Sequence, residues 1–223
     1  MMLRVTSIGA MFALAGCSGG LDNLSLPSLP SFPAFFEKQQ DAPAISPKLA
    51  LLGGDFVAVG PDRYCADTAA SNPSKGFAIF VACKTLGVED AEPAMAGIVT
   101  IQVGDVGSAI VADNPAAFAA VLSGDAGAAI LARGGDADTI DIQSVEHKAD
   151  RVSVHFKDEA DAHIVGAQHA EWRNFVDVAG RLVTITVRGF DSAPLGEAVG
   201  AGLLAQATDA VLAANADTSA TDG

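Results

Sequence analysis

Residues 172–187 read WRNFVDVAGRLVTITV, and this stretch decides the fold. Two runs of β-branched and aromatic residues flank Ala179-Gly180, a pair typical of a tight turn, so the stretch predicts a β-hairpin. Pairing around the turn puts Val178 opposite Arg181, Val176 opposite Val183, Asn174 opposite Ile185 and Trp172 opposite Val187. One face is then strongly apolar and carries Trp172, Val176, Val183, Ile185 and Val187. The other face is mixed and carries Arg173, Thr184, Thr186, Phe175 and Leu182. One buried face is what an antiparallel sheet covered by helices requires.

The hairpin belongs to a longer series of predicted strands. Each segment combines β-branched or aromatic residues with turn formers at its ends. These segments are 56–59, 77–81, 98–103, 139–146, 151–157, 168–178 and 182–188. Asn114-Pro115 is typical of a helix start, with Asn114 as the cap. Residues 49–52 are a short apolar lead-in, and 124–135 is a glycine-rich stretch of small residues.

A C-terminal helix follows the last strand, and we expect Ser192-Ala193-Pro194 to open it. One apolar stripe recurs every three to four residues and consists of Leu195, Val199, Leu203, Ala207, Val211 and Ala214. Gly196, Gly200 and Gly202 each weaken such a helix by about 1 kcal/mol, which close packing on the sheet must offset. Asp209 and the acidic tail are expected to be solvated.

These elements predict an α+β fold, with an antiparallel sheet of about six or seven strands covered by helices. We expect one globular domain over residues 49–215, including the C-terminal amphipathic helix, and a disordered acidic tail over 216–223. The hairpin and the helix that follows it resemble the C-terminal half of PsbP-like proteins. That resemblance covers about 45 residues and implies an α/β/α module of the accessory or assembly type. The segment from Cys65 to Cys83 departs from the pattern.

The N-terminus carries a secretory signal. Arg4 precedes a mostly apolar run, and Leu14-Ala15-Gly16-Cys17 follows it. This order resembles the lipobox of bacterial lipoproteins, which implies removal of residues 1–16 and diacylation of Cys17. An ordinary signal peptide with a chance cysteine is the alternative, since the run is too short to span a bilayer. In such lipoproteins a residue other than Asp after the cysteine, here Ser18, implies sorting to the outer membrane.

Residues 17–48 are expected to form a tether. The spacing Pro27-x-x-Pro30-x-x-Pro33 favours polyproline geometry and excludes a helix or central strand. Some 30 residues at ~3.1 Å each could hold the domain up to ~90 Å from the membrane. Three aromatic residues are unusual in a spacer, and their docking on the domain, the bilayer or a partner stays open. They are Phe32, Phe35 and Phe36.

The chain has 13 basic and 27 acidic residues and a formal net charge of −14. Such a charge repels the phosphate backbone, so we expect no nucleic-acid partner. A cationic partner is permitted, although solubility alone also accounts for the charge.

The chain has three cysteines. If Cys17 carries lipid, Cys65 and Cys83 remain as a pair in an oxidising compartment, which favours a disulfide between them. A bridge closing a loop of this length contributes on the order of 3 kcal/mol. A metal site with Tyr64 and Asp67 nearby, or two free thiols, are the alternatives. Direct pairing of 56–59 with 77–82 would place Cys83 near Asp55, so the chain would have to fold back to bring Cys65 within reach.

Candidate chemistry concentrates in residues 146–171. Four histidines lie there among carboxylates: His147, His155, His163 and His169, with Glu146, Asp158, Glu159, Asp161 and Glu171. No pair has the i, i+4 spacing of a zinc protease helix, so solvated strand and loop histidines are the simpler interpretation. We find no catalytic motif and assign no catalytic residue, metal site or cofactor.

The sequence therefore predicts a membrane-anchored, periplasm-facing lipoprotein of the cell envelope. We expect a non-enzymatic accessory, assembly or interaction module, held to the membrane through the lipid on Cys17, with an envelope protein as the candidate partner. The alternative is a small-ligand- or metal-binding lipoprotein, or a hydrolase, that uses the region 146–171. Convergence of three of its histidines or carboxylates in one pocket would favour that alternative.

Overall fold

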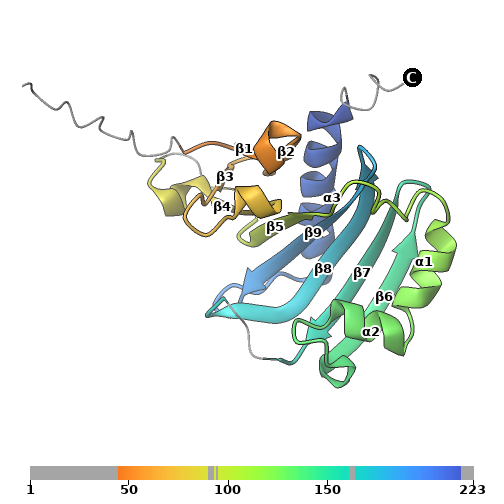
Figure 1. The fold of residues 1–223 in the computed structure, drawn as a ribbon. Coiled ribbons are helices and arrows are strands. Elements are labelled where there is room, and N and C mark those ends of the chain that lie inside the picture. The colour runs from red at the N-terminus through yellow and green to blue at the C-terminus, as the bar shows by residue number, and fades with distance from the viewer. Residues whose placement is uncertain (1–44, 90–92, 94, 161–163, 217–223) are drawn as a thin grey trace, which may run out of the picture. The chain divides into compact units, whose positions relative to one another are not determined.

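The computed structural model describes residues 45–89, 93, 95–160 and 164–216. Seven strands form one antiparallel sheet in the order β3-β4-β5-β9-β8-β7-β6, as Figure 1 shows. Their bounds are β3 Tyr64–Ala66, β4 Phe77–Ala82, β5 Ile98–Val103, β6 Ile140–His147, β7 Arg151–Asp158, β8 Ala167–Val178 and β9 Arg181–Phe190. The predicted α+β class is confirmed. Short 3₁₀ helices cover Leu52–Gly54, Pro73–Lys75, Cys83–Leu86 and Ala137–Thr139.

The hairpin formed by β8 and β9 has the predicted register. Val176 pairs with Val183, and Trp172 pairs with Val187. Ala179 and Gly180 have φ values of 50° and 72°, and positive φ at both central residues is what a type I′ hairpin turn requires. The turn and the alternating pattern therefore agree on one register.

The N-terminal strands differ from the expected pairing. The lead-in forms a strand, β1 Lys48–Leu51, which pairs with β2 Phe56–Val59 in a separate two-stranded sheet. The strand beside β4 is β3, with Cys65 opposite Val81. Direct pairing of 56–59 with 77–82 is therefore wrong, because β3 occupies that edge.

The pairing of β3 with β4 brings the two cysteines together. Cys65 and Cys83 form a disulfide with a Cα–Cα distance of 4.8 Å, and both are 5% exposed. The predicted disulfide is confirmed, and β3 supplies the fold-back that the sequence left unexplained.

The helix α3, Glu197–Ala214, packs on one face of the sheet, here called the α3 face. The helix starts at Glu197 rather than near Pro194: Phe190 and Ala193 form a β-bridge, and Gly196 is the N-cap with extended backbone. The predicted burial of Val199 is wrong, since it is 42% exposed. The buried stripe is displaced round the helix and consists of Gly200, Leu203, Leu204, Ala207, Thr208 and Val211.

Two short helices, α1 Pro115–Leu122 and α2 Asp125–Leu131, cover the opposite face, here called the α1/α2 face. Asn114 caps α1 as predicted, with its side chain accepting a hydrogen bond from the N–H of Ala117. The helix α2 was not predicted. A Cβ on Gly127 would lie 2.3 Å from the Cα of Leu122, so this glycine allows the two helices to approach closely.

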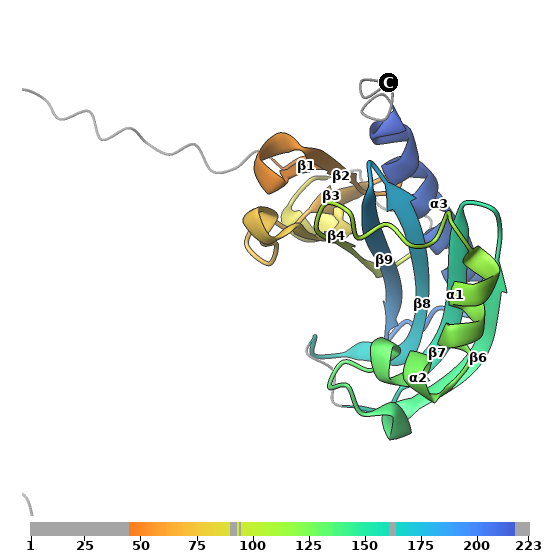
Figure 2. The same ribbon diagram turned by 45° about the vertical axis from the view of Figure 1, so that its right-hand side comes forward.

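Two hydrophobic clusters follow from this arrangement. The larger one lies on the α3 face and includes Trp172, Val176, Val183, Ile185, Val187, Leu203 and Val211. The smaller one lies under α1 and α2 and includes Val152, Val154, Phe156 and Phe175. Figure 2 shows α1 and α2 beside β6 and β7, away from β4 and β5. The sheet is thus packed on both sides, but by different helices over different strands.

Candidate functional site

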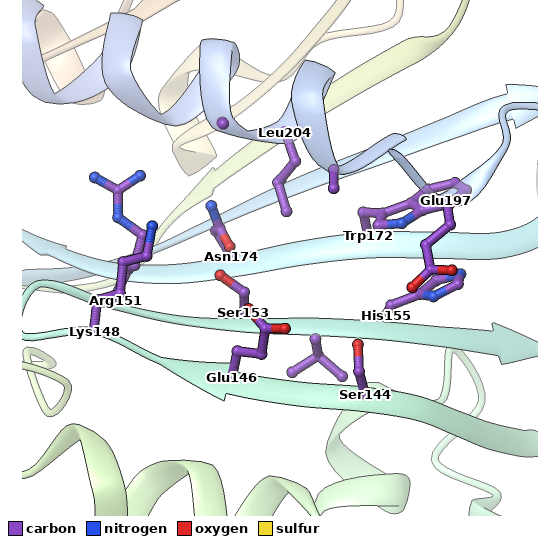
Figure 3. Close-up of a pocket in the computed structure, with 13 residues that line it drawn as sticks. Ser144, Glu146, Lys148, Arg151, Ser153, His155, Trp172, Asn174, Glu197 and Leu204 are labelled. Atoms are coloured by element: carbon purple, nitrogen blue, oxygen red, sulfur yellow. The ribbon is translucent and has the colours of Figure 1, made fainter. Parts of the chain in front are cut away.

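A groove on the α3 face runs between α3 and strands β6 and β7 (Figure 3). Its volume is about 220 Å³. Strand register aligns its floor in two rows across the sheet. One row consists of Ser144, His155 and Trp172, and the other consists of Glu146, Ser153 and Asn174. The polar side of β6 and β7 and the edge of the larger core therefore meet in this groove.

The helix α3 forms the facing wall of the groove. A Cβ on Gly200 would lie 2.4 Å from the Trp172 ring, so glycine is needed for the helix to pack this closely. Ala201 and Ala205 line the groove next to it, and their small side chains leave space over the strands. The groove therefore results from two features of α3: the close contact of the helix at Gly200, and the small side chains beside it.

The orientation of the Asn174 amide is fixed by its neighbours. The Thr208 hydroxyl donates to the carbonyl of Leu204 at 2.8 Å, so it must accept from the Asn174 Nδ2 at 2.8 Å. The Asn174 Oδ1 therefore faces away from α3, and Figure 3 shows it on the side of Ser153. Within the described residues, this buried acceptor and the buried Nε1 donor of Trp172 have no hydrogen-bond partner.

His155 stacks on Trp172, with ring centroids 4.6 Å apart and an angle of 7° between the planes. Burial lowers the pKa of His155 below its usual value of 6.5; Glu197 opposes this effect and Lys157 adds to it. The imidazole is therefore neutral at pH 7 and presents one donor and one acceptor.

Charged side chains close the other end of the groove, where Lys148 and Arg151 lie (Figure 3). The Arg151 guanidinium donates to Asp150 at 2.7 Å and to Asp209 at 3.2 Å. The hydrogen bond from Arg151 lowers the pKa of Asp150. Asp209 is exposed, as expected for a solvated side chain, but it lies inside α3 and its ion pair with Arg151 links that helix to β7.

In the described part of the chain, His155 makes no hydrogen bond to Ser144 or Ser153. Nor do any three His, Cys, Asp or Glu side chains of those residues group as a metal site would require. The groove offers hydrogen-bond donors and acceptors, a stacked aromatic pair and charges of both signs.

The predicted region 146–171 does not converge on this groove. Glu146 and His155 line it, whereas the His169 Nδ1 lies 2.7 Å from the carbonyl oxygen of Asp158, and Glu171 is buried on the α1/α2 face. His147 pairs with Val152, whose side chain belongs to the smaller cluster. Alternation along a strand sends neighbouring side chains to opposite faces, which divides the region.

Several predicted residues lie outside the described residues. These are His163, Asp161, Cys17 with the signal segment, the aromatic residues Phe32, Phe35 and Phe36, and the acidic tail beyond Ala216. Sequence reasoning in turn missed the roles of Ser153, Asn174 and Glu197. One signal was present, because Arg151, Ser153 and His155 alternate with buried residues and so share one face.

No protein-family model and no curated protein matches this chain. Among the described residues, no helix combines the length and apolar character needed to cross a membrane.

Proposed function

We propose that this chain is a lipoprotein of the bacterial cell envelope, anchored by the lipid on Cys17 and facing the periplasm. Its domain acts as a non-enzymatic accessory, assembly or interaction module. The observation that carries the proposal is the order Leu14-Ala15-Gly16-Cys17 directly after an apolar run. The resemblance of the hairpin and α3 to PsbP-like modules agrees with an accessory role.

Two structural features support this proposal. The buried disulfide between Cys65 and Cys83 suits an oxidising compartment outside the cytoplasm. The groove provides noncovalent contacts from two elements, α3 and the β6–β7 hairpin, which suits recognition of a partner.

Metabolic labelling with an alkyne-tagged fatty acid tests the anchor. The wild-type chain and the control Ser18→Ala should both take up label and sediment with membranes. Cys17→Ser should take up none, because it lacks the acylated sulfur. Label on the Cys17→Ser protein would contradict the proposal.

Sorting is tested by Ser18→Asp. The lipoprotein resemblance implies that wild type fractionates with the outer membrane and that aspartate at this position retains the protein in the inner membrane. Identical fractionation of Ser18→Asp and Ser18→Ala would contradict outer-membrane sorting signalled by this residue.

Photo-crosslinking in the native envelope tests the interaction role. A benzophenone amino acid at Ala205, on the groove wall, should give a discrete protein adduct in the anchored chain. The same probe at the exposed Ala213 of α3 is the matched control. Absence of a protein adduct at Ala205, or the same adduct from both positions, would contradict a protein partner at the groove.

A second candidate function, binding of a small polar ligand in the groove, is favoured by the unpartnered Asn174 Oδ1 and Trp172 Nε1. Native mass spectrometry of protein purified from its own envelope should then detect a bound small molecule. Ala205→Trp should remove it by filling the groove, and Ala213→Trp should not. Retention of the molecule in Ala205→Trp would exclude the groove as its site.

A further inference from the structure

A second cavity lies on the α1/α2 face of the sheet. Its volume is about 360 Å³, within the range of small-molecule sites. Apolar side chains from β4, β5 and the segment before β8 line it, and two arginines lie among them. The lining residues are Phe77, Ile79, Ile98, Thr100, Ile164, Thr186, Arg133 and Arg188. We call this cavity the arginine pocket.

The arginine pocket adjoins a buried ionic cluster. Glu171 is fully buried and forms ion pairs with Arg133 at 3.4 Å, with Arg173 at 3.0 Å and with Arg188. Asp158, also fully buried, pairs with Arg133 at 3.1 Å. Within the described residues, three guanidinium groups of this cluster thus meet two carboxylates, which leaves one positive charge in excess. A buried charge without compensation is costly.

Two of the three arginines use their donors within the protein. Arg133 also donates to the carbonyls of Asp158 and Ala160, at 3.0 and 2.7 Å. Arg173 also donates to the Thr186 hydroxyl at 3.2 Å and to the carbonyl of Leu131 at 3.4 Å. These two side chains are therefore held in place by fixed acceptors.

Arg188 differs from the other two. Among the described residues its side chain pairs with Glu171 only, whereas Arg133 and Arg173 each donate to further acceptors. The buried Nε of Arg188, like that of Arg133, makes no hydrogen bond. The side chain is 12% exposed and lines the arginine pocket. Burial lowers the pKa of Arg188 below its usual value, with the charge of Glu171 opposing that effect. An anionic head group in this cavity would accept hydrogen bonds from the remaining N–H donors of the Arg188 guanidinium and would pair with its charge.

We propose that the arginine pocket binds a small amphiphilic anion. Its carboxylate or phosphate head lies on Arg188, and its apolar body lies against Phe77, Ile79, Ile98 and Ile164. The head neutralises the excess charge of the cluster, and the body buries apolar surface that neither α1 nor α2 covers. This site is separate from the groove, on the opposite face of the sheet.

Calorimetric titration of the chain from residue 17 to 223, carrying Cys17→Ser, tests the proposal. The probes are octanoate, octyl phosphate and the neutral 1-octanol, all at pH 7. At least one anion should bind at least tenfold more tightly than 1-octanol, and the tighter anion identifies the head group. Equal affinity for 1-octanol and both anions would overturn the proposal.

Two variants locate the binding. Arg188→Gln should weaken binding of the anion at least tenfold while leaving 1-octanol within twofold, and Lys157→Gln, an exposed cation on the other face, should change neither. Thr100→Trp fills the pocket without removing charge and should abolish binding. If Arg188→Gln does not fold, the Thr100→Trp variant provides the test. Unchanged anion binding by Thr100→Trp would overturn the proposal.

The same titration can show whether a segment of this chain, instead of a small anion, occupies the arginine pocket. Phe35→Ser combined with Phe36→Ser removes the aromatic residues nearest the domain in sequence. If only this double variant binds the anion, the chain itself fills the pocket and a small-molecule role is contradicted. Equal anion affinity with and without the two substitutions is the result expected.

Discussion

The two faces of β8 bury polar groups in opposite ways. On the α3 face, Asn174 is a neutral amide that donates to Thr208 and keeps an unpartnered acceptor beside an open groove. On the α1/α2 face, Glu171 is a full charge surrounded by three arginines. A neutral polar group needs one or two hydrogen bonds to be buried, whereas a charge needs counter-charges held in fixed geometry. Each face therefore has a different sensitivity to substitution, ligand and pH.

The largest effect is expected at Glu171. Glu171→Ala leaves the guanidinium groups of Arg133, Arg173 and Arg188 buried with Asp158 as their remaining carboxylate, and this should lower the free energy of unfolding by about 3–5 kcal/mol. Urea unfolding of the Cys17→Ser chain over residues 17–223 measures it. An effect below that of Asn174→Ala would show that the cluster is not the stabilising feature of this face.

Leu203→Ala tests the apolar packing of the α3 face. Leu203 is 1% exposed against the sheet, so its truncation should cost about 2–5 kcal/mol through lost transfer energy and a cavity. The same change at Gln206, exposed on the same helix, is the control and should cost much less. Equal, small effects at both positions would mean that α3 is peripheral to the core.

Asn174→Ala should have a smaller effect than either. It removes one neutral hydrogen bond to Thr208, which is worth about 1 kcal/mol in typical cases. The unpartnered Oδ1 disappears with it, which offsets part of that loss. A loss as large as that of Glu171→Ala would contradict the contrast between the two faces.

The smallest expected effect is on the pH dependence of the free energy of unfolding. The two faces differ here because their ionisable groups titrate in different pH ranges. Burial lowers the pKa of His155 in the folded state, so the unfolded state binds more protons as pH falls through 6.5. The free energy of unfolding should therefore decrease between about pH 7 and 5, and His155→Gln should flatten this decrease. A steeper decrease in the variant would contradict the sign.

Asp158 on the other face should respond at lower pH. Burial raises its pKa and is the largest single effect, but hydrogen bonds from the N–H groups of Ala160 and Arg133 and from the Thr139 side chain, together with the charge of Arg133, lower the pKa below 3.8. The stability that Asp158 contributes is present above that value and is lost as pH falls below it. Unfolding curves of wild type at pH 7, 5 and 3 separate the two ranges, because the His155 contribution changes between the first two and the Asp158 contribution between the last two.

The sequence predicted the β8–β9 hairpin because two local signals coincide there. Alternation sets the faces, and Ala179-Gly180 sets the turn, so the register followed without any distant contact. The buried face of α3 was harder to predict, since a spacing of three to four residues fits either Val199 or Gly200 as the buried position. Contact of Gly200 with the Trp172 ring decides it, and that contact joins two separate elements.

The ionic cluster could not be predicted in the same way. Arg133 lies 38 residues before Glu171, in the segment after α2, and no periodic pattern connects them. The helix α2 itself was missed because Gly127 weakens the helical pattern while serving contact with Leu122. In both cases the deciding contact joins residues that no periodic sequence pattern connects. The groove was partly accessible, since Glu146 and His155 belong to the region that the sequence marked.

The most direct test of the contrast between the faces is an NMR titration of the ¹⁵N-labelled Cys17→Ser chain with octanoate. We expect saturable shifts of the amides of Ile79, Thr100 and Arg188, around the arginine pocket. The amides of Ser153 and Asn174, at the groove, should stay unchanged. Shifts centred on the groove, or no saturable shifts at all, would contradict the assignment of the excess positive charge on the α1/α2 face to an anionic ligand.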